Sequence, residues 1–274
     1  MKIKVISTLN MLIFIALFIL IVYQLIFSKQ PDTGLLYKEA ELFAASGFTW
    51  IIIKKKERDA YAKLYEAHID GAFENDKRNY RQLIYAIQLL HQGKEKAAIK
   101  LLQRLENSCV ERKDTIAVLS FLAPAYARNK EADKAIETYR ALLAVNPDKA
   151  STWSDLGVLY DRQNHMEMAV DCYKKALACD ENYEPAHSNI AFCYLKVKIS
   201  KVALYHALRA LKLKDGEQGT ISLVAIAYAQ LGDIENMEKY YAMYCDVCSS
   251  KREKKELRQI LDQHLFYSKQ NVKR

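Results

Sequence analysis

Apolar residues recur along most of this chain at the spacing of an α-helix. Trp153, Leu156, Gly157 and Tyr160 fall at i, i+3, i+4 and i+7, which places them on one face of a helix. Two polar residues then break the pattern, and it resumes over residues 166–177. Strand-like alternation of useful length is absent from the sequence. We therefore predict an all-α fold built from pairs of helices.

The helical pattern repeats at a fixed interval of 34 residues. A tyrosine recurs at the same position of each interval. It is preceded by a large apolar residue and then a very small one, and Ala or Met follows nine residues after it. Small residues on both segments let two helices approach closely. A period of this length is typical of a two-helix unit stacked into a solenoid. The tyrosines are Tyr126, Tyr160, Tyr194 and Tyr228.

One repeat carries most of a known motif. The tetratricopeptide repeat pattern W-x2-L-G-x2-Y, followed by A-x3-F and A, is matched by Trp153, Leu156, Gly157, Tyr160, Ala169, Tyr173 and Ala176. The chain thus resembles the tetratricopeptide repeat family, although Glu181 stands where that family often has Pro. The resemblance implies a right-handed superhelical solenoid of antiparallel helix pairs over residues 79–248. Its five repeats are 79–115, which has three extra residues, 116–149, 150–183, 184–217 and 218–248.

The N-terminal region, 1–30, has a different composition. From Val5 to Phe27 it is uncharged and mainly apolar, and as a helix it would reach about 35 Å. The hydrocarbon core of a bilayer is about 30 Å thick. A cleaved signal peptide is the rival interpretation, because Lys2 and Lys4 precede the run, but no small-x-small cleavage motif follows. We expect one uncleaved transmembrane helix and a single-pass membrane protein.

Two features of the sequence disagree about the side of the membrane that the repeats occupy. Lys2 and Lys4 before the apolar run slightly favour an N-terminus inside the cytoplasm, which would place the repeats outside. The six cysteines show no disulfide-scaffold spacing, which favours a reducing compartment. The side of the membrane stays open.

The segments that flank the repeats are also expected to be helical. Residues 31–78 contain two amphipathic runs, which we interpret as a degenerate helix pair leading to the solenoid. Residues 249–274 carry Leu257, Ile260, Leu261 and Leu265 at helical spacing beneath a charged string, and end in a basic tail. A solenoid needs such a polar-faced helix to cap its last unit.

The candidate chemistry is sparse. Cys245-x-x-Cys248 has the spacing of redox pairs and half-zinc sites, but it lacks a strand-to-helix context and two further ligands. The six histidines form no metal-binding pattern, and no nucleophile or phosphate-loop motif is present. We therefore expect no enzyme, no cofactor and no metal.

The net charge of +8 arises from 41 basic and 33 acidic residues. These charges are largely interleaved and are not accompanied by stacking aromatics, so nucleic-acid binding is not expected. Lys54, Lys55 and Lys56 could contact anionic lipid, or simply form a solvated helix face.

In the family that this chain resembles, the first helix of each repeat lines a concave groove. Only Asn189 matches the residues with which some members grip a C-terminal carboxylate, whereas apolar positions suit a helix or extended peptide. Pro124 is expected to kink one such helix, with no role assigned. The predicted partner-binding residues are Ser120, Arg128, Ser154, Val158, Asp161, Arg162, Ser188, Phe192, Leu195, Lys196, Ser222, Ile226 and Gln230.

These features predict a membrane-anchored scaffold or adaptor that binds a partner helix or peptide in the concave groove. The alternative is an accessory envelope protein that binds anionic lipid or polymer through its basic surface. A CxxC redox or metal-binding protein is a third interpretation. The partner and the oligomeric state are left open.

Overall fold

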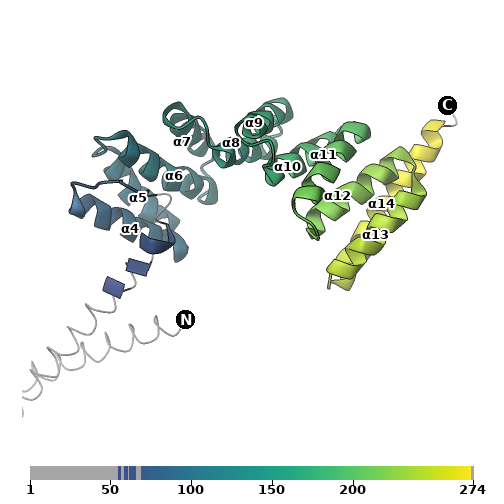
Figure 1. Ribbon diagram of the computed structural model, residues 1–274, viewed down its shortest axis with the longest axis horizontal. Helices are drawn as coiled ribbons and strands as arrows, with labels where there is room; N and C mark the ends of the chain where they lie inside the picture. Colours follow the sequence, from purple (N-terminus) through teal and green to yellow (C-terminus); the bar gives the residue numbers. More distant parts are fainter. Residues whose placement is uncertain (1–54, 57–58, 61, 66–68, 273–274) are drawn as a thin grey trace, which may run out of the picture. The chain divides into compact units, whose positions relative to one another are not determined.

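The computed structural model describes residues 55–56, 59–60, 62–65 and 69–272. Every regular element in this part of the chain is a helix, so the prediction of an all-helical solenoid is confirmed (Figure 1). The expected anchor from Val5 to Phe27 and most of the approach segment 31–78 lie outside the described residues. Among the residues described, no helix combines the length and the apolarity needed to cross a membrane.

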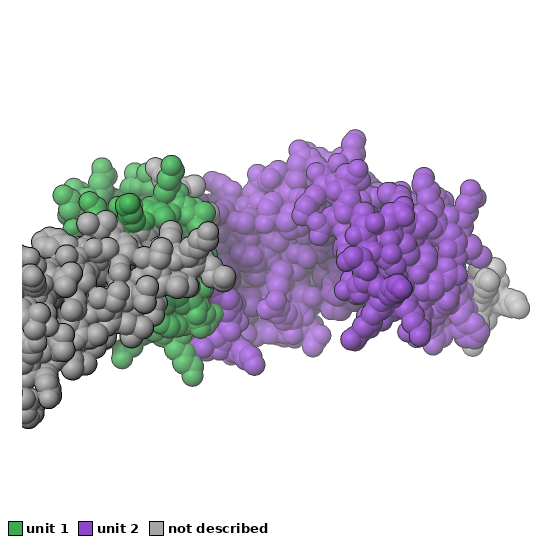
Figure 2. All heavy atoms as spheres, turned by 90° about the horizontal axis from the view of Figure 1, so that it is seen from below, with its two compact units in different colours: residues 1–121 green, residues 122–274 purple. Residues whose placement is uncertain are grey.

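The chain divides into two compact units, residues 1–121 and 122–274 (Figure 2). The boundary falls within helix α6, Arg112–Arg128, which also contains Pro124. Pro124 lies inside this helix, as expected. It has no N–H to donate to the preceding turn, so one backbone hydrogen bond of the helix is missing there. We describe the two units separately.

The first unit contains helices α4, Lys77–His91, and α5, Glu95–Glu106, which pack against each other. Asp76 caps the N-terminus of α4, because its carboxylate accepts hydrogen bonds from two backbone N–H groups of the first turn at 2.9 and 3.0 Å. The turn after α4 contains Gly93 with a positive φ of 69°, a conformation that glycine adopts without steric cost. The core of this pair is built from Leu83, Ile84, Ile87, Ala98, Leu102 and Leu105.

A buried carboxylate fixes the turn that precedes α4. Asp114, only 5% exposed, accepts a hydrogen bond of 2.6 Å from the backbone N–H of Phe73, and the N–H groups of Val110 and Glu111 donate to its other oxygen. Phe73 has a positive φ of 50°, which is unusual for a non-glycine residue. Asp114 therefore caps the start of α6 and stabilises a strained turn at the same time.

The second unit is a series of helices in which consecutive members pack together. Short turns join the two helices of each pair, which makes them antiparallel. The helices are α7, Ala132–Val145; α8, Ala150–Arg162; α9, Met166–Cys179; α10, Glu184–Lys196; α11, Ser200–Leu213; α12, Gln218–Leu231; α13, Ile234–Val247; and α14, Lys251–Val272.

The turn inside each helix pair has the same backbone geometry. Its central residue has a positive φ at every 34th position, and only the last of the four is glycine. The next backbone N–H then donates to the carbonyl of the column tyrosine, at 2.9 to 3.0 Å in all four turns, which is a Schellman-type helix end. The backbone conformation of the turn, and not only the residue type, therefore recurs every 34 residues. The four residues are Lys130 (65°), Asn164 (61°), Lys198 (61°) and Gly232 (77°).

The small-residue columns are buried between helices. Ala135, Ala169, Ala203 and Met237 are all fully buried, and Tyr126 and Tyr160 are each only 5% exposed. Gly157 shows how close the approach is, because a Cβ atom there would lie 2.6 Å from Cε1 of Tyr173. Most of the repeated residues are therefore committed to packing.

The last helix, α14, lies where a cap was expected. Leu257, Leu261 and Leu265 are buried against the preceding helices, but Ile260 is exposed, so its assignment to the apolar face is wrong. Helix α14 packs more extensively against α12 than against α13. One residue of α14, His264, lies beside α12 at the hollow described below.

Candidate functional site

A hollow of about 690 Å³ runs along helices α10 and α12 and is bordered by one residue of α14. We call it the α10–α12 groove. All of its residues belong to the second unit. It is lined by Glu184, Pro185, Ser188, Asn189, Phe192, Leu195, Lys196, Lys198, Glu217, Gly219, Thr220, Ser222, Leu223, Ile226, Gln230 and His264.

Seven of the thirteen residues proposed for a concave groove line this hollow. They come from two helices at positions 34 residues apart, such as Phe192 and Ile226. The structure therefore places them together on equivalent faces of the two helices. The seven are Ser188, Phe192, Leu195, Lys196, Ser222, Ile226 and Gln230.

The other six proposed residues do not line it. Ser154 is only 4% exposed, and its hydroxyl accepts a hydrogen bond of 3.5 Å from the Nδ2 group of Asn189, so it is not available on a free surface. Asp161 borders the groove only through an ion pair with Lys196. Ser120, in the first unit, is half-buried; Val158 is half-buried; Arg128 and Arg162 are exposed.

The floor of the groove is apolar. The ring of Phe192 is 47% exposed, although it belongs to a helix that is otherwise well packed. Leu195 is buried beside it, and Leu223 and Ile226 of α12 are half-buried. Exposed apolar area of this kind is unfavourable in water and favours a ligand that covers it.

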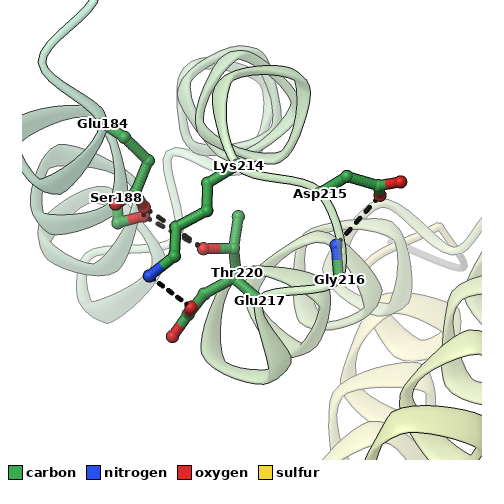
Figure 3. Close-up of polar contacts among 7 residues, drawn as sticks. All are labelled: Glu184, Ser188, Lys214, Asp215, Gly216, Glu217 and Thr220. Carbon is green, nitrogen blue, oxygen red and sulfur yellow. Dashed lines mark hydrogen bonds and ion pairs between the residues drawn. The ribbon is translucent and has the colours of Figure 1, made fainter.

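A carboxylate and two hydroxyls link α10 and α12 where both helices begin (Figure 3). Ser188 donates a hydrogen bond of 2.6 Å to Oε1 of Glu184, and Thr220 donates to the same oxygen at 3.5 Å. The two hydroxyl oxygens lie 3.2 Å apart. Nearby, Lys214 forms an ion pair of 2.7 Å with Glu217. This end of the groove is therefore acidic and internally hydrogen-bonded.

A second polar link joins the same helices at their other end. Gln230 donates from Nε2 to the backbone carbonyl of Leu195 at 3.1 Å, and its Oε1 accepts a hydrogen bond of 2.7 Å from Ser200. Gln230 thus uses both ends of its amide within the fold. Although it lines the groove, Gln230 is therefore held by hydrogen bonds within the fold.

Basic groups border the groove at this second end. The Lys196 ammonium pairs with Asp161 at 2.7 Å and lies 5.3 Å from the Phe192 ring centroid. Lys198 lies over the ring of Tyr267 at 5.4 Å. Burial, and then the positive charge of Lys198, lower the pKa of His264. Lys198 and His264 were not predicted, because one lies in a turn and the other on a helix outside the repeat pattern.

Comparison with known proteins agrees with this architecture. Residues 114–182 match a family model described as tetratricopeptide repeat. This segment is similar in sequence to tetratricopeptide repeats. A search of curated protein sequences found no match.

Solved structures with low sequence identity share the fold of these repeats. A crystal structure of MamA is 18% identical with a TM-score of 0.54, covering 62% of this chain and 96% of MamA. MamA 41-end from Desulfovibrio magneticus RS-1 is 11% identical with a TM-score of 0.56, covering 62% and 95%. YrrB, described as a TPR protein with an unusual peptide-binding site, is 13% identical with a TM-score of 0.55, covering 74% and 99%.

A second hollow of about 660 Å³ lies over α7, α8 and α9. Its aromatic side chains are already paired: Lys175 lies 4.9 Å from the centroid of Trp153, whose Nε1 donates to the carbonyl of Pro147 at 2.8 Å. Arg140 donates a hydrogen bond of 2.5 Å to the hydroxyl of Tyr160. The aromatic side chains of this hollow are thus occupied within the fold, whereas Met168 in its lining is 43% exposed.

Two histidines of the repeat 184–217, the buried His187 and the half-buried His206, form a pair. The Nδ1 atoms of His187 and His206 lie 2.9 Å apart, and His187 Nε2 lies 3.1 Å from the carbonyl oxygen of Glu181. A carbonyl oxygen only accepts, so His187 Nε2 carries a proton and its Nδ1 accepts from His206. Burial, then His187, then Lys174 lower the pKa of His206 to about 4.

The cysteines show no grouping that would hold a metal. Cys248 is buried and donates from Sγ to the carbonyl of Ser250 at 3.6 Å, while Cys245 is half-buried. Burial raises the pKa of both Cys172 and Cys193 to about 11, which keeps these thiols protonated and unreactive near neutral pH. Over the described residues, no three His, Cys, Asp or Glu side chains cluster as metal ligands would.

Proposed function

We propose that this chain is a non-catalytic scaffold or adaptor that binds a helix or peptide of a partner protein in the α10–α12 groove. The observation that carries the proposal is the exposed Phe192 ring in an apolar trough that is closed by polar links at both ends. An amphipathic helix or extended peptide covers such a trough well. The peptide-binding site of YrrB, a protein of the same fold, also supports it.

We further propose that the apolar run from Val5 to Phe27 anchors the chain in a membrane. An anchor raises the effective concentration of the groove for membrane-bound partners, so that weak contacts suffice. Extraction of native membranes at alkaline pH tests the anchor: the chain is expected in the pellet. Protease accessibility of a C-terminal tag, in intact and permeabilised cells, then decides the side on which the repeats lie.

Binding of anionic lipid or polymer through a basic surface receives less support. Many basic side chains of the second unit are paired with acids, among them Arg252 with Glu256 and Arg258 with Glu238. Paired charges attract a polyanion weakly, and salt screens what attraction remains. No observation on the described residues favours a redox or metal function at Cys245 and Cys248.

A photo-cross-linking amino acid placed at position 192 tests the groove. In cells that produce the chain, we expect it to form a reproducible cross-linked protein band, because the ring at this position faces the trough. The control places the cross-linking amino acid at position 266 instead, because the ring of Phe266 is 60% exposed but does not line the groove. A second substitution, Ile226→Asp, should remove the band from position 192. Identical bands from positions 192 and 266, or no band at 192, would contradict the proposal.

A further inference from the structure

The two ends of the α10–α12 groove carry opposite charge. Glu184 and Glu217 lie where α10 and α12 begin, and one lysine, Lys214, accompanies these two carboxylates (Figure 3). Lys196 and Lys198 lie at the other end. An occupant therefore meets different electrostatic potentials at its two ends, and complementary charge favours one direction of binding.

The two lysines are not equivalent. Asp161 neutralises Lys196 at 2.7 Å, whereas Lys198 forms no ion pair with any of the residues that the structure describes. The ring of Tyr267, whose centroid lies 5.4 Å from the ammonium, stabilises it without supplying a counter-charge. Lys198 also sits in the hydrogen-bonded turn after α10, with φ of 61°. The groove thus ends in a cation that is held in this turn and that no described carboxylate neutralises.

His264 adds a hydrogen-bonding group beside this cation. Both side chains line the same hollow, and burial, followed by the positive charge of Lys198, lowers the pKa of the imidazole. A carboxylate bound here would pair with the Lys198 ammonium and could accept a hydrogen bond from the imidazole N–H. Between this end and the glutamates lies the apolar floor around Phe192.

We propose that the groove takes an apolar segment of a partner protein flanked at one end by Asp or Glu side chains, and that these acidic side chains lie at Lys198. This inference rests on the proposed function. The opposite end of the segment, over Glu184 and Glu217, is neutral or basic, because acids there would face like charge. We assign the carboxylate to side chains because Gln230, the one amide at this end, already donates to Leu195 and accepts from Ser200, which leaves it one N–H for a chain terminus.

Selection from a random 16-residue peptide display library tests the inference. The bait is the full chain in detergent micelles, with the Phe192→Asp variant used for counter-selection. We expect the selected peptides to share an apolar core with Asp or Glu enriched at one end. Lys198→Glu should weaken their binding about tenfold, while Lys201→Glu, which reverses an exposed lysine outside the groove, should leave it unchanged.

Synthetic peptides then distinguish the two sources of carboxylate and the direction of binding. An amidated C-terminus should bind as well as a free one; loss of binding on amidation would overturn the assignment to side chains. A photo-reactive group at the acidic end should label Lys198, Tyr267 or their neighbours, and labelling near Glu184 would overturn the direction.

The possible failures are separable. Peptides that need Phe192 but show no charge preference, or that tolerate Lys198→Glu, would overturn this inference and leave the proposed function standing. Failure to select any peptide that Phe192→Asp rejects would contradict both. Thermal unfolding of each variant, matched to the parent, confirms that binding and not folding has changed.

Discussion

The two hollows of the second unit have nearly the same volume, about 690 and 660 Å³, but differ in how their side chains are used. Over α7, α8 and α9, Trp153 and Tyr160 are hydrogen-bonded and covered by cations. Along α10 and α12, the Phe192 ring is 47% exposed even though Lys196 lies 5.3 Å from its centroid, and Lys198 has no counter-ion among the described residues. Cavity size alone therefore does not identify a binding site. The unsatisfied groups do.

The largest expected effect concerns the helix beneath the second hollow. Gly157→Ala places a methyl group within 2.6 Å of the Tyr173 ring, which is buried on every side, so α8 and α9 must move apart. We expect a loss of about 3 kcal/mol in the free energy of unfolding, measured by urea denaturation. Gly219→Ala in the groove is the matched control, because a Cβ there meets nothing within 4 Å. Equal losses in the two variants would show that the close approach of α8 to α9 is not a special constraint.

The next prediction separates a structural aromatic residue from an exposed one. Trp153→Ala removes a ring, its hydrogen bond to Pro147 and its contact with Lys175, and should lower stability by about 2 kcal/mol. Phe192→Ala removes a ring that is 47% exposed, and should cost less than about 1 kcal/mol while abolishing peptide binding. Differential scanning calorimetry of both variants measures this. A larger loss of stability in Phe192→Ala would remove the distinction between the two hollows.

Acid should affect the two regions unequally. His206 keeps its neutral form when folded, with a pKa of about 4 against an ordinary 6.5, so the unfolded chain binds more protons between these values. Its stabilising contribution is therefore complete above pH 6.5 and is lost as the pH falls toward 4, by about 1 kcal/mol after solvent screening.

The protection factors of α10 and α11, which compare the exchange rate with the intrinsic rate at the same pH, should fall over that range more than those of α8 and α9. His206→Gln removes the titrating imidazole and serves as the control, in which this extra loss of protection should disappear. An unchanged pH response in that variant would show that other groups cause it.

The smallest effect concerns the turns. Lys198 adopts a left-handed conformation that glycine tolerates better, so Lys198→Gly should stabilise the fold by about 0.5 kcal/mol once the greater freedom of glycine in the unfolded chain is subtracted. The same variant should weaken binding of acid-flanked peptides. Thermal unfolding and peptide titration measure the two effects, which have opposite signs. If the variant loses both stability and binding, the loss of binding cannot be assigned to the missing charge.

The repeat period predicted most of the fold because the same helix-packing contacts occur in every repeat. The turns at Lys130, Asn164, Lys198 and Gly232 lie where the pattern breaks, and the tyrosine carbonyls close them. The small residues nine positions after each tyrosine are buried as predicted. A repeated environment imposes the same requirement on each copy, and that requirement is visible in the sequence.

The groove was only partly predictable, for a related reason. Phe192 and Ile226 follow from the repeat register, but His264 reaches the groove because α14 packs mainly on α12, a contact that occurs once. Ser154 shares its register with groove residues, yet a side chain from the following repeat covers it. Features that depend on unique contacts leave no periodic trace.

The two polar links across the groove also bear on how a partner is received. Glu184 with Thr220, and Gln230 with Leu195, tie α10 to α12 near each end of the trough. Helices fastened at both ends cannot readily close on each other when the trough is empty or spread when it is filled. The conformational entropy lost on association then falls mainly on the incoming segment. A partner that is already helical, or stiffened by proline, would bind more tightly than a flexible one with identical contacts.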